Sequence, residues 1–278
     1  MKPTAKTPVI MWTVNAAMTP AIIAAVYERG DGALWQIALA VAACVASESL
    51  CVLWRRMSVS DSLSDGSATL AGIIIGLSLP PQAPWHVAVT AAICAMALAK
   101  HCYGGLGNNP FNPAMAGYAL AFVSFPGDFA GWNAGETVRA SYDAVSMPTP
   151  LSGTKLGIET PPPSYVFPAA CAAGGVVVLY LRFADWRLPA AFIGGALLFC
   201  GGDFIELAKG GLMLAAFFVI TDPVTAASTA RGRWLYGACA GALVMLLRQH
   251  GPHVDGIAFA ILACNMLAPL MDGIWRRR

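Results

Sequence analysis

Glu48 is the only acidic residue in a long apolar run, and it lies between Ser47 and Ser49. An ionisable side chain is costly in hydrocarbon surroundings, and one that is kept there usually faces a partner or a polar path. Glu48 is therefore a candidate ligand for a proton or a cation on an ion path. It would equally fit a carboxyl group that is kept neutral or is paired with a neighbouring protein chain.

Two other polar residues precede prolines where apolar segments are interrupted. Asp222 is followed by Pro223, and Asn112 is followed by Pro113. Such a pair often begins a helix, because the side-chain oxygen accepts from free amides and proline fits the first helical position. Alternatively, each pair ends one half-helix and starts another whose amides point at a ligand phosphate.

Metal and nucleic-acid sites are not indicated by the residue pattern. The eight cysteines are scattered singly, without the paired spacing of a metal site or a disulfide framework. We expect them to pack as small buried apolar side chains. The net charge of +2 and the lack of a Lys- or Arg-rich segment argue against nucleic acid as a partner.

The elements that position these residues are membrane helices. The chain is 57% hydrophobic and 12% charged, which leaves too little polar surface for a soluble domain of 278 residues. About ten apolar segments are candidate spans, and several are shorter than the ~20 residues of a full crossing. They cover roughly residues 9–27, 33–54, 67–79, 85–99, 111–126, 164–181, 188–205, 210–221, 234–247 and 255–272.

Two of the short segments stop at prolines and are predicted to be broken helices. Segment 67–79 ends before Pro80, and segment 210–221 ends before Asp222-Pro223. Non-helical backbone at membrane depth persists only where protein or a polar cavity satisfies its hydrogen bonds. The breaks therefore predict a buried polar site.

The two halves of the chain show a similar order of features. In each half an apolar run breaks at proline and is followed by an Ala- or Gly-rich helix, a polar turn and a final helix. With five segments in each half, two copies would be inverted in the membrane, which places sites at their interface. Such a pattern of Ala-rich helices can also arise by chance. We expect an all-α polytopic fold with an N-terminal repeat (1–126), an extracytoplasmic loop (127–163) and a C-terminal repeat (164–278).

The basic residues predict the orientation of the chain. If the N-terminus is cytoplasmic and the segments alternate, most of the 17 Lys and Arg residues, Lys100 among them, fall in cytoplasmic loops. This distribution predicts that both termini lie in the cytoplasm.

Three stretches of the chain resemble one known family. They read SDGSATLAG at 64–72 with LSLPPQAPW at 77–85, AKHCYGGLGNNPFNPAMAGY at 99–118, and TDPVT at 221–225 with RGR at 231–233. They are similar to the D subunits of Rnf ion-translocating electron-transport complexes, the NqrB/RnfD family. This family is related to the B subunit of the sodium-pumping NADH:quinone oxidoreductase.

The resemblance implies an FMN joined by a phosphoester to a threonine of the outer loop, a bond made by a flavin transferase. The family's acceptor pattern is Asp-x-x-Ser-Gly-Ala-Thr. Asp143, Ser146 and Thr149 match it, while Met147 and Pro148 replace the glycine and the alanine. These replacements add bulk and restrict the backbone.

The resemblance also implies a function. The chain would relay electrons coupled to Na⁺ or H⁺ transport, together with the other subunits of an Rnf-type complex, and would not catalyse a reaction alone. Asn112, Asp222 and Thr225 are candidate contacts of the flavin, and Glu48 belongs to the candidate ion path. A second flavin has no support from the residues. The alternatives are a flavin-less structural subunit and a small-solute channel or transporter with a similar inverted-repeat architecture.

Overall fold

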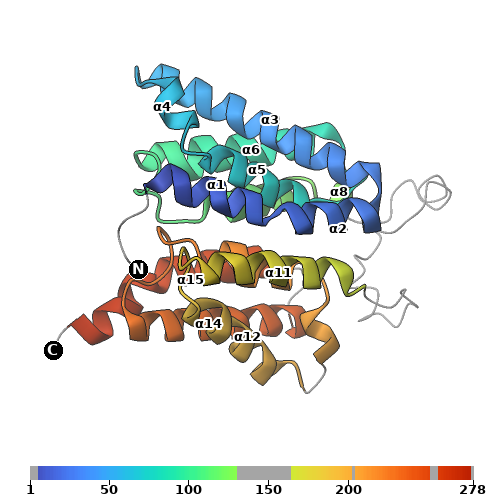
Figure 1. Ribbon diagram of the computed structural model, residues 1–278, viewed down its shortest axis with the longest axis vertical. Coiled ribbons are helices and arrows are strands. Elements are labelled where there is room, and N and C mark those ends of the chain that lie inside the picture. Colours follow the sequence, from blue (N-terminus) through green and yellow to red (C-terminus); the bar gives the residue numbers. More distant parts are fainter. Residues whose placement is uncertain (1–5, 130–163, 202–203, 251–255, 277–278) are drawn as a thin grey trace.

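The computed structural model describes residues 6–129, 164–201, 204–250 and 256–276, and all the secondary structure in these ranges is helical. Figure 1 shows the helices in two groups, one formed by the first half of the chain and one by the second half. The predicted all-α class is confirmed. Asp143, Ser146 and Thr149 lie outside the described residues.

The first group begins with two helices of 11 residues, one on each side of a break at Met18, which lies just before Pro20. Its elements are α1 (Thr7–Ala17), α2 (Thr19–Arg29), α3 (Asp31–Trp54), α4 (Val59–Leu63), α5 (Ser67–Ser78), α6 (Trp85–Ile93), the π-helix η1 (Cys94–Lys100), the 3-10 turn η2 (His101–Tyr103), α7 (Pro113–Ser124) and α8 (Pro126–Phe129).

The second group contains fewer elements in its described residues, and two of its helices, α14 and α15, have 21 and 20 residues. Its elements are α11 (Val166–Tyr180), α12 (Arg187–Phe199), the 3-10 turn η3 (Phe204–Leu207), α13 (Leu212–Leu214), the π-helix η4 (Ala215–Val219), α14 (Ala230–His250) and α15 (Ile257–Arg276). Each of the predicted segments coincides with a helical segment. The shortest, 210–221, is a single turn of α-helix that continues as a π-helix.

Within the described residues, four helical segments are long and apolar enough to cross a membrane. They are Thr7–Arg29, Asp31–Trp54, Trp85–Tyr103 and Ile257–Ile274. Four shorter apolar helices accompany them: Ser67–Ser78, Pro113–Ser124, Val166–Tyr180 and Arg187–Phe199. This combination supports a multi-pass membrane protein that contains interrupted helices.

The helix directions agree with the predicted topology. In Figure 1, α1 begins and α15 ends at the left, whereas α8 and the start of α11 lie at the right. The two flanks of residues 130–163 are therefore at the opposite end from α1's start and α15's end. Helices α1 and α11 run in opposite directions where the two groups meet, as an inverted repeat would require. The duplication and the cytoplasmic location of the termini stay predictions.

Close helix packing depends on small residues, as is usual where lipid gives helices little reason to associate. In the first group, a Cβ on Gly72 of α5 would lie 2.5 Å from the Cα of Val41 in α3. In the second group, Gly195 of α12 meets the carbonyl of Ala238 in α14 with no room for a side chain. A Cβ on the neighbouring Gly194 would have no heavy atom within 4 Å.

This difference predicts unequal effects of the same substitution on α12. Gly195→Val should force α12 and α14 apart and reduce the yield of folded protein, at a cost of about 1–3 kcal/mol for overpacking. Gly194→Val has the same helix propensity but meets no neighbour, so it is the matched control. Size-exclusion profiles and thermal unfolding in detergent would measure both, and equal behaviour of the two variants would contradict the packing described for Gly195.

Candidate functional site: a polar cavity between the two halves

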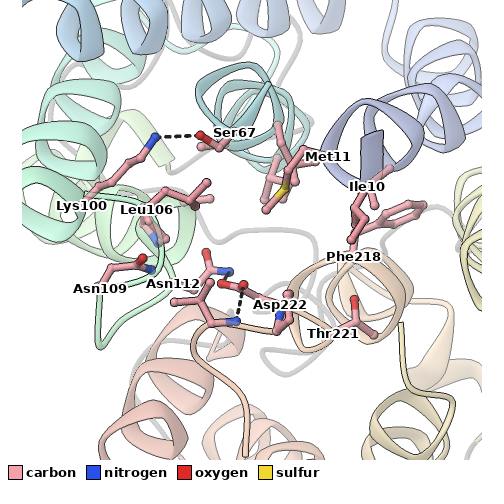
Figure 2. Close-up of a pocket in the computed structure, with 18 of the residues that line it drawn as sticks. Ile10, Met11, Ser67, Lys100, Leu106, Asn109, Asn112, Phe218, Thr221 and Asp222 are labelled. Atoms are coloured by element: carbon pink, nitrogen blue, oxygen red, sulfur yellow. Dashed lines mark hydrogen bonds between the residues drawn. The ribbon is translucent and has the colours of Figure 1, made fainter. Parts of the chain in front are cut away.

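A cavity lies between the two helix groups, and both contribute to its wall (Figure 2). The lining comes from α1, α5, η1, the connection 106–112 and the start of α7 in the first group, and from α11, residues 183–184 and residues 218–224 in the second. Most of the lining is apolar, and its polar members are Ser67, Lys100, Asn109, Asn112, Thr221 and Asp222. The volume of about 80 Å³ is below the ~300–1,000 Å³ of organic-ligand pockets. Such a cavity suits water molecules or a small ion.

Asn112 forms one polar edge of the cavity. Its Oδ1 accepts a hydrogen bond from the Met115 amide at 3.2 Å, and Pro113 is the first residue of α7. The predicted helix cap at Asn112 is confirmed. Its Nδ2 also donates to Asp222 Oδ2 at 3.4 Å, which links the two halves of the chain across the cavity edge.

Asp222 behaves differently from the prediction. Helix η4 ends at Val219 and the next helix, α14, begins only at Ala230. No helix starts at Pro223, so both the predicted cap and the predicted second half-helix are wrong. Instead Asp222 Oδ1 accepts from the Val224 amide at 3.0 Å and Oδ2 accepts from the Thr225 hydroxyl at 3.0 Å, which closes a turn. Aspartate forms such turns as readily as it caps helices.

Asn265 of α15 completes this polar network and was missed by the sequence analysis. Its Oδ1 accepts from the Asn112 amide at 3.1 Å, and its Nδ2 donates to the Tyr236 hydroxyl at 2.6 Å and to the Thr225 carbonyl at 3.3 Å. Asn112, Thr225 and Asn265 are all buried. The sequence could have indicated Asn265, because it is a lone polar residue in its apolar segment, just as Glu48 is the lone acidic residue in its own.

The turn between η4 and α14 is held from two sides. Asp272 of α15 accepts four hydrogen bonds of 2.7–2.9 Å from the amides and hydroxyls of Ser228 and Thr229. On the other side, Arg233 donates to the Ala227 carbonyl and to Asp185 in the α11–α12 connection. These contacts fix the residues that follow Asp222.

Asp185 is ionised in this arrangement. Burial acts to raise its pKa, but hydrogen bonds from the Arg187 amide and the Arg233 guanidinium, together with the charges of both arginines, bring the pKa below its ordinary value. The Arg-Gly-Arg motif at 231–233 thus contributes a structural ion pair through Arg233.

Glu48 lies deep in the first helix group, next to the cavity wall. Its side chain is fully buried, and Lys100 Nζ donates to Oε1 at 2.7 Å and to Oε2 at 2.6 Å. Ser62 Oγ donates to Oε1 at 2.7 Å, and His101 Nε2 is 3.8 Å away. Glu48 is therefore paired, but its partner is Lys100 of the same chain and not a neighbouring chain as that alternative had it.

Lys100 was predicted to lie in a cytoplasmic loop, and this prediction is wrong. It is 2% exposed at the end of η1. Its Nζ also donates to Ser67 Oγ at 2.7 Å, and its side chain forms part of the cavity wall. Figure 2 shows the ammonium group directed at Ser67.

The Glu48–Lys100 ion pair predicts a large loss of stability when one charge is removed and a recovery when both are removed. Glu48→Gln leaves the Lys100 charge buried without a counter-charge and should cost about 3–5 kcal/mol. The double variant Glu48→Gln/Lys100→Met removes both charges and should recover much of this loss. Thermal unfolding in detergent measures the series, and a double variant no more stable than Glu48→Gln would show that the two side chains are not coupled.

The anchoring of the turn by Asp272 gives a second prediction. An asparagine nitrogen cannot accept a hydrogen bond, so Asp272→Asn leaves donors of Ser228 or Thr229 unpaired, at about 1–3 kcal/mol each. The melting temperature should fall accordingly. Asp61→Asn, on the exposed side of α4, is the control and should change it little. A similar effect of the two variants would mean that the Asp272 contacts do not hold the turn.

The fold and the site define a multi-pass membrane protein whose two halves enclose a small, mostly apolar cavity lined by a buried ammonium and a half-buried carboxylate. The model of the NQR2, RnfD, RnfE family matches residues 1–278, and the chain belongs to this family.

Individual relatives match over nearly their whole length. The D subunit of the ion-translocating oxidoreductase complex of Tolumonas auensis is 36% identical over an alignment that is 319 positions long with its gaps and covers 95% of this chain and 92% of that protein. The proteins with the same name from Cronobacter sakazakii and Vibrio cholerae are each 35% identical, and cover 97% and 95% of this chain and 93% and 92% of their own lengths.

Proposed function

We propose that this chain is the D-type membrane subunit of an ion-translocating oxidoreductase complex, that it carries FMN covalently on Thr149, and that its cavity is part of a Na⁺ or H⁺ path. The observation that carries the ion path is the cavity itself. Buried Lys100 and half-buried Asp222 face it inside a mostly apolar interface, and ionisable groups are kept at such depth mainly where they serve transport or binding.

The names of the relatives support the coarse function. Proteins that align with almost all of this chain are subunits of ion-translocating oxidoreductase complexes, so partner subunits are part of the proposal. A bacterial inner membrane is proposed on the likeness to these subunits, and cytoplasmic termini are proposed on the distribution of basic residues.

The flavin proposal rests on the match of Asp143, Ser146 and Thr149 to the family's acceptor pattern. A flavin transferase would make the bond to the Thr149 hydroxyl. When bound, FMN would supply one- and two-electron redox chemistry, while the protein positions it. The contacts of Asn112, Asp222 and Thr225 with a flavin stay a prediction, and the size of the cavity beside them favours an ion.

The structure describes where the chain re-enters the bundle after this segment. Glu28 at the end of α2 accepts from the Ser164 hydroxyl at 2.6 Å and from the Phe167 amide at 2.9 Å. Arg29 donates to the Leu77 carbonyl at the end of α5 and lies over the Phe167 ring at 4.5 Å. These contacts hold the start of α11 against the first helix group at the end proposed to carry the flavin.

Thr149→Val tests the flavin anchor. The variant lacks the hydroxyl that forms the phosphoester, so the intact mass should lack FMN and the denatured band should lose flavin fluorescence. Thr160→Val lies in the same segment and should keep both signals. Fluorescence that persists in Thr149→Val would place the anchor elsewhere, and a wild-type chain from its own complex without FMN mass would favour a structural subunit.

A further inference from the structure

The Lys100 ammonium fills a cage of oxygen atoms that could hold a free cation. Three oxygens lie 2.6–2.7 Å from Nζ, two from Glu48 and one from Ser67. The Ser67 hydroxyl donates its hydrogen to Asp65 Oδ1 at 2.5 Å, so a lone pair faces Lys100. Oxygen ligands that include a carboxylate are those that hard cations prefer. The lysine therefore occupies the position that a transported cation would take at Glu48.

Lys100 also has a way out of this cage. Its side chain lines the cavity, and it ends the π-helix η1, a rare geometry that is frequent at functional sites. A lysine charge is carried on a flexible stem of four carbons, so the ammonium group can change partners while the backbone stays in place.

Asp222 is the other charged group on the cavity wall. Its hydrogen-bond partners in the described parts of the chain are the neutral groups of Asn112, Val224 and Thr225. Figure 2 shows Lys100 with Ser67 along one edge of the cavity and Asp222 with Asn112 along the opposite edge. The Asp222 side chain is half-buried, and a carboxylate shielded from water without a counter-charge is costly, so Asp222 calls for a cation or a proton.

The charges around the cavity indicate how many cations it needs in addition to Lys100. Glu48 and Asp222 provide two negative charges and Lys100 provides one positive charge, so one further monovalent cation makes the set neutral. The other titratable or charged groups that face Glu48 or Asp222 are Cys44, Cys51, Arg55, Asp65, His101 and Tyr236. Arg55 is exposed and Asp65 is half-buried, and neither lines the cavity.

We propose that Lys100 is a tethered competitor of the transported cation, and that the two exchange places between Glu48 and Asp222. In the state described here, Lys100 holds Glu48 and the transported cation belongs to Asp222. In the other state, the cation binds Glu48 and Ser67 while Lys100 crosses the cavity to Asp222. Both states are neutral, and the return of Lys100 displaces the cation from Glu48. This inference rests on the proposed ion path.

The exchange predicts opposite effects of two substitutions in the complete complex, reconstituted in sealed vesicles. Lys100→Met removes the competitor and should lower the cation concentration for half-maximal redox-driven transport. Asp222→Asn removes the second resting place of Lys100 and should raise it. A change on the order of 5- to 150-fold corresponds to the usual coupling between two sites. The double variant should behave as Lys100→Met does.

Transport is measured as a function of Na⁺ concentration at constant pH in one arm, and as a function of pH at constant low Na⁺ in the other. The arm in which the half-maximal cation concentration shifts identifies the cation. Lys209→Met is the matched control, since Lys209 pairs with Glu206 outside the cavity lining. An unchanged half-maximal concentration in both arms, or a shift in the same direction for Lys100→Met and Asp222→Asn, would overturn the exchange. Should Lys100→Met not assemble, a half-maximal concentration unchanged by Asp222→Asn alone is sufficient to overturn it.

Two further measurements distinguish a failure of this inference from a failure of the proposed function. FMN content and electron transfer of each complex are measured in detergent beside the transport assay. A wild-type complex that lacks flavin or moves neither cation contradicts the proposed function. A wild-type complex that transports normally, with Lys100→Met altering only the yield of folded complex, shows instead that Lys100 has a structural role.

Discussion

The burial of ionised groups in an apolar interior is the constraint on which the inner part of this structure depends. Glu48 and Lys100 could each be buried only with a counter-charge and with hydroxyl groups for the remaining hydrogen-bonding sites. Their pairing brings together α3, the end of η1 and the start of α5, which carries Ser67. The same cluster forms part of the cavity wall, so the ion pair determines both the packing of these helices and the charge of the site.

The second half of the chain satisfies a non-helical segment with both charged and neutral side chains. This segment lies between η4 and α14, and Asp272, Arg233 and Asn265 form hydrogen bonds with its polar atoms. Asn112 joins this network from the first half through Asp222 and Asn265. The two halves are therefore connected by hydrogen bonds at the cavity, and also at Glu28, which binds the start of α11.

Sequence reasoning succeeded where a local rule decides the structure. The apolar segments predicted the helices, because each must satisfy its own backbone in a membrane, and Asn112-Pro113 predicted a cap that depends on only three further residues. It failed at Asp222, because the same side chain can cap a helix or close a turn. It also failed at Lys100, since the rule that places basic residues in loops takes no account of a carboxylate within reach.

The order of residues is enough to show that this chain is an all-α membrane protein of the NQR2, RnfD, RnfE family and that Glu48 needs a partner, because composition and isolated charges in apolar runs do not depend on long-range contacts. The identity of that partner emerges only from the folded chain. Glu48 and Lys100 are 52 positions apart, and Asn112 and Asp222 are 110 apart. Contacts at such separations follow from how α3, η1, α7 and the η4 turn pack, which no local pattern specifies.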